Sequence, residues 1–465
     1  MKPVKNLFIP LVILLLFACR KESFTNSSSA RLVTSQDTLH FDTVFTSTGS
    51  VSQLVKIKNE NNKGVHIASV QLAGGPNSSF AINVDGSPGP VVKNLDIAAN
   101  DSLYIFVSVH INPSAANLPF LVRDSIEINY NNNRQFIQLD AFGMNAHFFR
   151  GRTITTSETW NNDLPYVILE RITVDNNATL TINKGCRIYM HADAPFIVNG
   201  TLVVNGQSAD SARVVFTGDR TDEPYRDFPA SYPGLVFNAS SKNNIINFGI
   251  IKNAYQGIVV LDPSTSTKLV LNETIIDNAY DIGLAGINTS ISARNLLISN
   301  CGKNLVVLKG GSYDFTHCTI ASLSNNFIQH KDPVFLLTNF IKQNGVPVSS
   351  NLNAVFRNCI FWGENNGIVP SEVVASRQGA GAFNVLFEKV LWRIKNPPEE
   401  CTVQDEVPGD PAFERTNGGQ TGFSFRLKLT SAAVNKGVAT GVNIDLDGNP
   451  RPFGLPDLGG YERQQ

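Results

Sequence analysis

The sequence predicts an all-β protein in which a right-handed parallel β-helix follows an N-terminal β-sandwich domain. Two patterns lead to this fold class. Short runs of β-branched and aromatic residues alternate with turn residues in the first third of the chain, and short apolar segments recur every 22 to 25 residues further on. No helix-forming stretch separates the recurring segments, which excludes a sheet built with crossover helices.

Composition narrows the class of function. The chain has 465 residues, 42% of them hydrophobic and 17% charged, with a formal net charge of -1. This apolar content is too high for a disordered chain, and the neutral charge argues against nucleic-acid binding. The sequence has no phosphate-binding glycine loop, no Gly-x-Ser-x-Gly and no His-Glu-x-x-His, so we do not expect a nucleotide-binding protein, an esterase or a zinc protease.

The first 18 residues are expected to be a signal peptide. Lys2 and Lys5 precede the apolar run 7–17, whose helical length of about 16 Å is too short for a bilayer core of roughly 30 Å. The run ends in Leu-Phe-Ala-Cys, which resembles the bacterial lipoprotein signal, although a Phe stands where that signal usually has a small residue. The resemblance implies a lipid on Cys19, a tether over 19–30 and an outer-membrane location in the cell envelope. An ordinary signal peptide with a chance Cys is the alternative.

Five cysteines remain after Cys19, and they are Cys186, Cys301, Cys318, Cys359 and Cys401. An odd number outside the cytoplasm excludes complete internal pairing. No two of them have a metal-site spacing. We expect buried free thiols, with disulfides between stacked coils as the alternative.

A β-sandwich is expected over 31–146. Its predicted strands are 39–45, 54–58, 66–73, 103–111, 125–130 and 135–142. Asn- and Gly-rich turns separate these strands. Three segments resemble the immunoglobulin-like abnormal-spindle/hydin group, and they are "VKIKNENNKGVHIASVQL", "SLYIFVSVHINP" and "IQLDAFG". Such domains are spacers or docking modules, so the resemblance implies no chemistry here.

After an expected linker over 147–164, the repeat indicates a parallel β-helix over 165–395. The aligned positions Ile246, Leu271, Ala293, Phe315, Phe356 and Phe387 begin a similar segment in each coil. One coil cannot bury its apolar edge alone, so stacked coils at about 4.8 Å should align these six side chains in one column. The equivalent Asn253, Asn278 and Asn300 are expected at sharp corners, because Asn tolerates left-handed backbone and its amide can bridge coils.

The opening coils, "ITVDNNATLTINKGCRIYMHADAPFIVNGTLVV", resemble pectin-lyase-like bacterial β-helix proteins. The ending "DLDGNPRPFGLPDLGGYE" resembles the C-terminus of the same envelope proteins. The likeness implies fold and compartment but no reaction. We expect 396–465 to form C-terminal coils and a cap in which Arg451 pairs with Asp457 and Tyr461 covers the last coil, because repeat folds need protected ends.

No catalytic set is recognisable, so the catalytic residues stay unknown. Lyases of this fold use a Lys or Arg base with carboxylates or Ca²⁺, and hydrolases use paired carboxylates. Arg393-Ile394-Lys395 matches one tripeptide of polygalacturonase-like enzymes, but the sequence has neither their Gly-His-Gly nor an adjacent Asp pair. His317 shares a corner column with Asn residues, which favours packing over acid–base work. A cleft with three or more acids beside Arg or Lys would indicate catalysis.

The candidate binding residues are two arginines and one charged loop. Arg294 and Arg357 are expected to face outward next to the apolar column and could meet an anionic glycan, or be plain solvated side chains. Asp222 and Tyr225 lie in an apparent loop excursion. A loop on a rigid scaffold often carries function, although an ordinary charged loop is the alternative.

Asn443, Asp445 and Asp447 match the oxygen-ligand positions that begin a Ca²⁺ loop, with Gly448 at the sixth place. Gly454 stands where the bidentate Glu should be. No cofactor is therefore expected, with Ca²⁺ as the alternative at these three residues.

Together these features predict an envelope lipoprotein whose β-helix is a non-catalytic glycan- or protein-binding module. Its expected partners are the membrane, through the lipid, and a polysaccharide or an envelope protein. Nucleic acid and nucleotides are not expected. A polysaccharide lyase or glycoside hydrolase acting on acidic polysaccharide is the alternative, and a purely structural envelope component is the third reading.

Overall fold

The computed structural model describes residues 23–46, 49–50, 52–112, 120–417 and 422–464. The chain divides into two compact units between Asn145 and Ala146. The expected signal peptide and Cys19 lie outside the described residues. No helix within the described part of the chain is long and apolar enough to cross a membrane.

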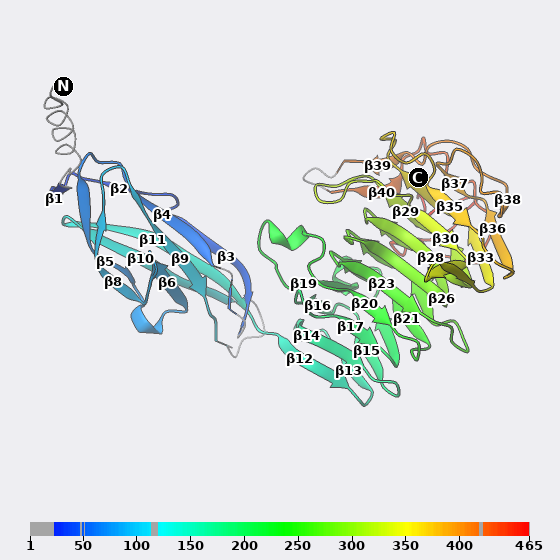
Figure 1. Cartoon of the computed structure of the whole chain (residues 1–465), viewed down its shortest axis with the longest axis horizontal. Helices are drawn as coiled ribbons and strands as arrows, with labels where there is room; N and C mark the ends of the chain where they lie inside the picture. The colour runs from blue at the N-terminus through cyan, green and yellow to red at the C-terminus, as the bar shows by residue number, and fades with distance from the viewer. Residues whose placement is uncertain (1–22, 47–48, 51, 113–119, 418–421, 465) are drawn as a thin grey trace, which may run out of the picture. The chain divides into compact units, whose positions relative to one another are not determined.

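The first unit is a β-sandwich of two sheets (Figure 1). One sheet has the order β1-β5-β10-β11-β3, with β8 also paired to β5, and the other has the order β2-β4-β9-β6-β7. Its strands are β1 (Phe24–Thr25), β2 (Leu32–Thr34), β3 (Thr38–Phe45), β4 (Gln53–Asn59), β5 (Gly64–Leu72), β6 (Phe80–Val84), β7 (Ser87–Pro88), β8 (Val91–Ile97), β9 (Ser102–Val109), β10 (Phe120–Tyr130) and β11 (Asn133–Met144). Apolar side chains of both sheets form one core.

The strands predicted for this unit are confirmed, and their pairing follows from the turns. Asn131 and Asn132, with φ of 44° and 59°, join β10 to β11 in a tight antiparallel hairpin. Two left-handed residues in a two-residue turn match the natural twist of a hairpin, and Asn adopts that conformation readily. The immunoglobulin-like assignment stays a prediction.

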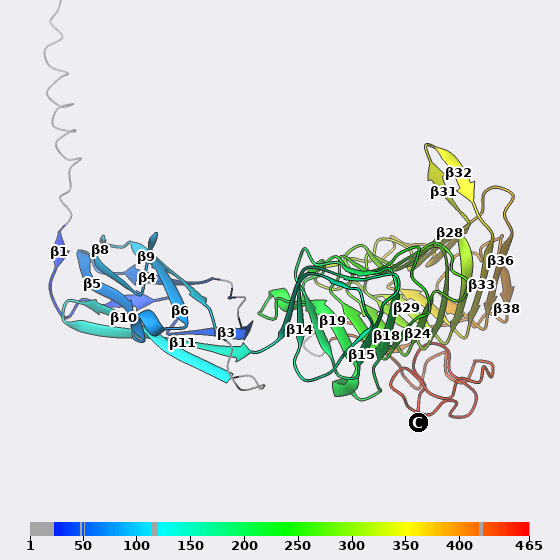
Figure 2. The same ribbon diagram turned by 90° about the horizontal axis from the view of Figure 1, so that it is seen from below.

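The second unit is a parallel β-helix whose coils carry strands on three faces (Figures 1 and 2). Face A contains β13 (Glu158–Trp160), β15 (Thr179–Asn183), β18 (Thr201–Asn205), β21 (Asn244–Asn247), β24 (Leu269–Asn272), the second halves of β26 (Ile282–Arg294) and β28 (Lys303–Thr316), β33 (Leu352–Arg357), β36 (Phe383–Glu388) and β38 (Thr402–Gln404). Face B contains the first halves of β12 (His147–Ile154) and β14 (Tyr166–Val174), β16 (Arg187–Met190), β19 (Val214–Gly218), β22 (Gly249–Lys252), β25 (Ile275–Asp277), β27 (Leu297–Ser299), β29 (Thr319–Ser322), β34 (Ile360–Gly363) and β37 (Leu391–Trp392). Face C contains the second halves of β12 and β14, β17 (Phe196–Val198), β20 (Leu235–Phe237), β23 (Gln256–Leu261), the first halves of β26 and β28, β30 (Phe335–Thr338) and β35 (Val373–Ser376).

Two antiparallel hairpins are added to the helix. They are β31 (Phe340–Gln343) with β32 (Val346–Ser349), and β39 (Phe413–Arg415) with β40 (Ser424–Leu427).

The predicted apolar column is confirmed residue by residue. Successive strands of face A pair in parallel with the register Ile246–Leu271, Leu271–Ala293, Ala293–Phe315, Phe315–Phe356 and Phe356–Phe387. All six side chains are buried, at 2% exposure or less. The column therefore forms the centre of one continuous apolar core, as stacked coils require.

The predicted asparagine corner, between faces B and C, is also confirmed. Asn253, Asn278 and Asn300 have φ values of 65°, 56° and 51°. The side-chain amide of Asn278 donates to Oδ1 of Asn253 in the coil below at 2.9 Å. The corner thus combines left-handed backbone with an amide bridge between coils.

The segment expected to be a linker differs from that expectation, because 147–164 is the first coil of the helix. β12 pairs with β14, and β13 pairs with β15. Trp160 is the first member of the apolar column, and it stacks on Tyr166 at 4.4 Å between ring centroids. A polar, three-residue strand gives little periodicity to recognise, but its single indole is large enough to seal the core.

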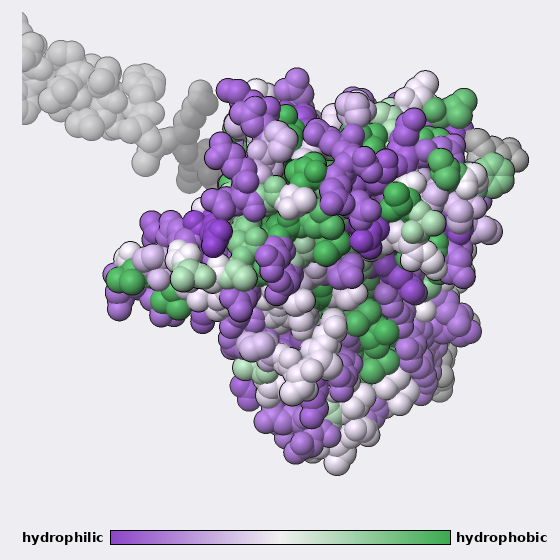
Figure 3. All heavy atoms as spheres, turned by 90° about the vertical axis from the view of Figure 1, so that its right-hand side faces the viewer, coloured by the Kyte–Doolittle hydropathy of each residue, from purple (hydrophilic) through white to green (hydrophobic). Residues whose placement is uncertain are grey.

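The C-terminal segment differs from the expected end cap. It lies along the side of the helix, where Leu446, Leu458 and Tyr461 join a separate apolar cluster with Leu297 and Ile360 of face B (Figure 2). Apolar side chains remain visible among polar ones where the last coils face the viewer in Figure 3. The segment packs laterally because face B there presents apolar side chains outward as well as inward.

Candidate functional site

Two adjoining cavities lie on the outside of face B, and together they are called the groove. The first, of about 590 Å³, is lined by Arg187, Tyr189, Arg220, Arg226, Asp227 and Lys252 among others. The second, of about 630 Å³, is lined by Asp227, Lys252, Asp277, Asn300, Asn326 and Phe327 among others. Asp227 and Lys252 line both cavities, so the two share a boundary.

The floor of the groove follows from strand alternation. In β16, β19 and β22, Ile188, Phe216 and Ile251 point into the core, so the residues beside them point outward. Parallel register then aligns Tyr189 with Thr217 and Lys252 with Asp277 on neighbouring coils. The sequence thereby places a row of polar and aromatic side chains across face B.

A loop over 219–233 forms one wall of the groove. It leaves the corner between faces B and C and contains the short 3-10 helix η3 (Tyr225–Asp227). The amide of Asn253 donates to the carbonyl of Arg226 at 2.8 Å, and that of Asn278 donates to the carbonyl of Asp227 at 2.9 Å. The asparagine corner therefore holds the wall in place.

Most arginines at the groove have partners. Arg220 donates to both carboxylate oxygens of Asp222 at 2.7 Å and lies 3.9 Å from the ring centroid of Tyr225. Arg226 forms ion pairs with Glu223 at 2.6 Å and with Asp227 at 3.5 Å. Arg187 donates to the carbonyl of Arg213 at 2.7 Å.

Lys252 is different, because its ammonium makes no hydrogen bond to any residue that the structure describes. Its charge acts on Asp277, the neighbour in register on the next coil. Burial raises the pKa of Asp277, whereas a hydrogen bond of 2.6 Å from the Ser299 hydroxyl and the charge of Lys252 oppose that rise. The groove therefore holds one cation available to a ligand beside a carboxylate that is already engaged.

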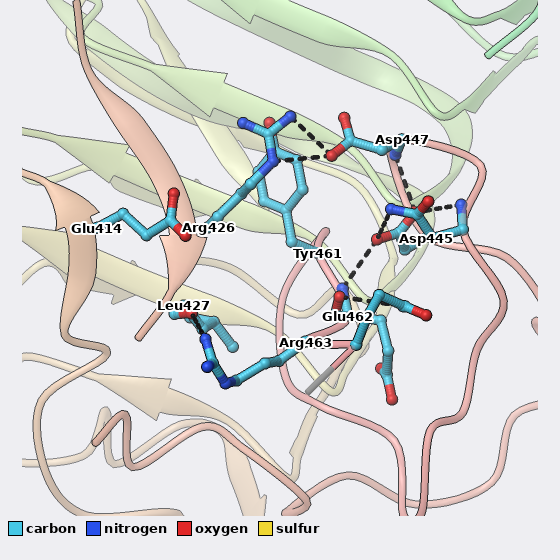
Figure 4. Close-up of a pocket in the computed structure, with 10 residues that line it drawn as sticks. Glu414, Arg426, Leu427, Asp445, Asp447, Tyr461, Glu462 and Arg463 are labelled. Carbon is cyan, nitrogen blue, oxygen red and sulfur yellow. Dashed lines mark hydrogen bonds and ion pairs between the residues drawn. The ribbon is translucent and has the colours of Figure 1, made fainter. Parts of the chain in front are cut away.

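A further cavity of about 260 Å³ lies in the C-terminal segment (Figure 4). It brings Glu414, Asp445, Asp447 and Glu462 together with two arginines, Arg426 and Arg463. Three or more acids beside Arg or Lys are the combination that the sequence analysis takes to indicate a catalytic cleft. Whether these carboxylates can act on a substrate depends on the groups that each one already contacts.

Both buried carboxylates of this cavity are occupied by backbone N–H groups. Asp445 accepts from the N–H groups of Asp447 at 3.0 Å, Asn449 at 2.8 Å and Glu462 at 3.1 Å. Glu462 accepts from the N–H groups of Phe453 at 2.8 Å and Asp457 at 3.0 Å. Burial raises the pKa of both carboxyls. They fold the C-terminal turns and offer little to a substrate.

The cavity also contains two of the residues predicted as Ca²⁺ ligands. Asp447 forms an ion pair with Arg426 at 2.7 Å. The main-chain carbonyl of Asn443 accepts from the N–H of Arg451 at 3.0 Å. Within the described ranges, no group of three or more His, Cys, Asp or Glu residues is placed to hold a metal ion. Ca²⁺ binding stays an untested prediction.

The structure brings two of the four predicted binding residues to the groove. Asp222 and Tyr225 belong to its wall. Arg294 and Arg357 lie on face A, where Arg294 pairs with Glu273 at 3.0 Å and Arg357 with Glu388 at 2.6 Å. Both guanidinium groups are therefore already neutralised.

Sequence reasoning missed Lys252, Asp277 and Asn300 as lining residues. A signal was present, since Lys252 and Asp277 occupy the same place in "IIKNAY" and "IIDNAY", 25 residues apart. Two opposite charges at one repeat position indicate side chains that meet on neighbouring coils.

No family model matches the chain, and no curated protein matches it. Solved structures similar to it include a pectate lyase, Pel9A, at 12% identity and a TM-score of 0.23, covering 68% of this chain and 97% of that one. A GH87 α-1,3-glucanase from Streptomyces thermodiastaticus has 8% identity and a TM-score of 0.15, covering 79% and 89%. A family 123 glycoside hydrolase from Clostridium perfringens has 12% identity and a TM-score of 0.19, covering 27% of this chain and about a quarter (26%) of the hydrolase. At these values the likenesses assign no activity to this chain.

Proposed function

We propose that the β-helix is a non-catalytic module that binds an acidic glycan in the groove of face B. The observation that carries the proposal is Lys252, which lines both cavities and whose ammonium has no hydrogen-bond partner among the described residues. A cation without a partner in a groove can pair with a carboxylate of a ligand, and a charge-assisted hydrogen bond is about twice as strong as a neutral one.

The size and lining of the groove agree with this role. Each cavity falls within the range of about 300–1,000 Å³ that is usual for small-ligand sites. In the first cavity, Arg220 and Arg226 are paired with carboxylates of the wall, whereas Arg187 and Lys252 form no ion pair with a described residue. A ligand with negative charge is therefore favoured there over a neutral one.

The groove favours binding over catalysis. Of its two carboxylates, Asp277 accepts a hydrogen bond from Ser299, and Asp227 forms an ion pair with Arg226. A hydrolase needs one carboxylic acid and one carboxylate free to act on the bond. The alternative, a polysaccharide lyase or hydrolase, draws on the four carboxylates of the C-terminal cavity and is tested in the same assay.

The experiment measures binding of the purified mature chain to pectin, alginate and glycosaminoglycan fragments by calorimetry. We expect Lys252→Met to weaken binding at least tenfold. Lys342→Met, in the exposed hairpin β31–β32, is the matched control and should leave the affinity unchanged. Equal affinity of Lys252→Met and the unaltered chain would overturn the proposal.

Turnover is followed on the same samples through unsaturated-uronate absorbance and reducing ends. Sustained product formation would replace the binding module by an enzyme. Binding without turnover supports the module and excludes the alternative for those substrates.

We further propose that the chain is a lipoprotein of the cell envelope, held in the outer membrane through acyl chains on Cys19. The support is the sequence alone, because Cys19 lies outside the described residues. Several acyl chains on one residue give firm anchoring, at about 0.8 kcal/mol per buried methylene. We expect Cys19→Ser to abolish palmitate incorporation and to release the protein from membrane fractions. Labelling that persists in Cys19→Ser would contradict the proposal.

A further inference from the structure

We infer that the groove has two chemically different subsites, so that its glycan carries an acidic sugar next to an uncharged sugar rich in hydroxyl or N-acetyl groups. This inference rests on the proposed function and names the class of ligand. It comes from the contrast between the two cavities, which meet at Lys252 and Asp227.

The second cavity is lined by side-chain amides where the first is lined by guanidinium groups. Asn300, Asn326 and Asn417 contribute to its surface. Amides both donate and accept hydrogen bonds, which matches the hydroxyl and N-acetyl groups of an uncharged sugar.

Asn300 is the lining amide with hydrogen-bonding capacity left for a ligand. Its side chain is only 3% exposed, and Oδ1 accepts from the N–H of Leu323 at 2.9 Å. Its Nδ2 group donates to no described residue although it borders the cavity. The Nδ2 group can therefore donate to a hydroxyl or carbonyl of a ligand in the cavity.

The neighbouring amides define what is available. Asn253, Asn278 and Asn325 bond to one another, with Asn325 donating to Asn278 at 2.7 Å and Asn278 donating to Asn253 at 2.9 Å. The hydrogen bonds of these amides are therefore made within the protein. The exposed Asn326, whose side chain has no hydrogen-bond partner among the described residues, stands beside this chain of amides and faces solvent.

The second cavity also has an aromatic rim. Phe327 is 42% exposed and contacts Phe228 of the wall at 5.0 Å between centroids. Phe423 of the C-terminal segment lines the same cavity. Exposed aromatic rings beside amides suit the apolar face and the hydroxyl edge of a sugar ring, since the aromatic group supplies contact area and the amides orient the ring.

Charge excludes a second acidic sugar from this subsite. Its described lining contains Asp227 and Asp277 with Lys252 as the single cation. When a carboxylate of the ligand pairs with Lys252, the two aspartates repel another carboxylate placed beyond it. Repulsion of the wrong ligand is a general source of specificity, so a uniformly charged polymer is disfavoured.

The experiment compares three oligosaccharide probes of equal length with the purified mature chain. These are hyaluronan, which alternates glucuronate with N-acetylglucosamine, polygalacturonate, which is charged on every ring, and neutral chitin oligomers. We expect hyaluronan to bind at least tenfold more tightly than either of the others. Tighter binding of polygalacturonate, or equal binding of the two acidic probes, would overturn the inference and leave the proposed function standing. Absence of binding to both acidic probes would overturn both.

A substitution tests the second subsite without touching Lys252. Asn326→Lys adds a cation at an exposed position whose side chain has no hydrogen bond within the described residues, so the fold should be unaffected. We expect it to raise the affinity for polygalacturonate at least fivefold relative to hyaluronan. The control is Gln329→Lys, at an exposed neighbouring residue that does not line the groove. Asn366 and Asn61 are less suitable positions, because the Asn366 amide donates to the carbonyl of His330 and the Asn61 amide is also hydrogen-bonded. An unchanged ratio in Asn326→Lys would contradict the inference.

Discussion

At the scale of single residues, left-handed corners decide which polar side chains are buried in the helix. His317 occupies the corner column of Asn295 and Asn358, with φ of 53° against 46° and 55°. Its Nδ1 lies against the buried guanidinium of Arg451 and 3.1 Å from the carbonyl of Asp457, and its Nε2 lies 3.0 Å from the Thr440 hydroxyl and 3.1 Å from the Asn358 amide nitrogen. The imidazole therefore connects the corner of the helix to the C-terminal segment, which agrees with the packing role expected from the sequence.

Protonation of His317 should destabilise the fold. Burial and the charge of Arg451 lower the pKa of His317 from 6.5 to about 2. The unfolded chain takes up a proton below about pH 6.5 whereas the folded chain does not, so stability is complete above that pH and falls as the pH decreases. Between pH 7 and pH 5 the loss from this one group is about 2 kcal/mol.

His317→Asn tests this, since Asn suits the left-handed corner. Urea denaturation at pH 7 and pH 5 should show a smaller loss of stability in the variant, by about 2 kcal/mol. Burial raises the pKa of Asp457 and Glu462 near Arg451, and these groups remain in both proteins. An identical pH dependence in the two proteins would refute the assignment of His317 as a neutral group.

At the scale of elements, the two outward surfaces of the helix differ although both follow the same alternation. On face A, outward polar side chains of neighbouring coils pair with one another. The amide of Asn272 donates to Asn247 at 2.8 Å, and Arg357 forms an ion pair with Glu388. Face B turns outward Lys252 and Asp277 near the groove, but Leu297 and Ile360 further along. The outward polar side chains of face A therefore pair with one another, whereas face B is divided between the groove and the surface on which the C-terminal segment packs.

The apolar column should tolerate loss of one ring poorly. Phe356 is fully buried and contacts Phe315 at 5.4 Å and Phe387 at 5.1 Å between centroids. We expect Phe356→Ala to lower the free energy of unfolding by about 3–5 kcal/mol, because the contacts are lost and a cavity remains. Chemical denaturation measures the change. Leu429→Ala, at a side chain that is 70% exposed, should change stability by no more than about 0.5 kcal/mol. A similar effect of both substitutions would contradict the stacked column.

At the scale of the whole second unit, the C-terminal segment seals the apolar part of face B. The amide of Asn295 donates to the carbonyl of Ile444 at 2.9 Å, and that of Asn358 donates to the carbonyl of Val438 at 2.8 Å. Buried Arg451 donates to the carbonyl of Gly459 at 3.0 Å and lies 3.5 Å from Glu462. The closing sequence motif therefore folds over the side of the helix, and the buried Arg451 holds its turns together.

Removal of residues 405–465 should expose this apolar surface. Leu297, Ile360 and Leu391 would lose their cover, and a large exposed apolar patch promotes association. We expect the truncated protein to bind a hydrophobic dye and to elute as aggregates in size-exclusion chromatography. A milder variant, Leu458→Asp, places a charge in the same cluster and should lower the thermal midpoint of the full chain. A monodisperse truncated protein without dye binding would contradict the lateral cover.

Much of the fold was determined by the sequence itself. The 22- to 25-residue period placed Ile246, Leu271 and Phe315 in one column, and the recurring Asn marked the corners, because one coil repeats the same physical requirements as the next. The lipid anchor and the calcium loop stay predictions from motifs alone.

The tertiary structure decided which polar residues meet. Lys252, Asp227 and Asn300 are far apart in the chain, and only winding brings them to one groove, while the same winding neutralises Arg294 with Glu273. A repeat specifies what each coil buries, since burial depends on local alternation. It does not specify what irregular loops and the returning C-terminal segment leave exposed, since that depends on contacts between segments with no shared period.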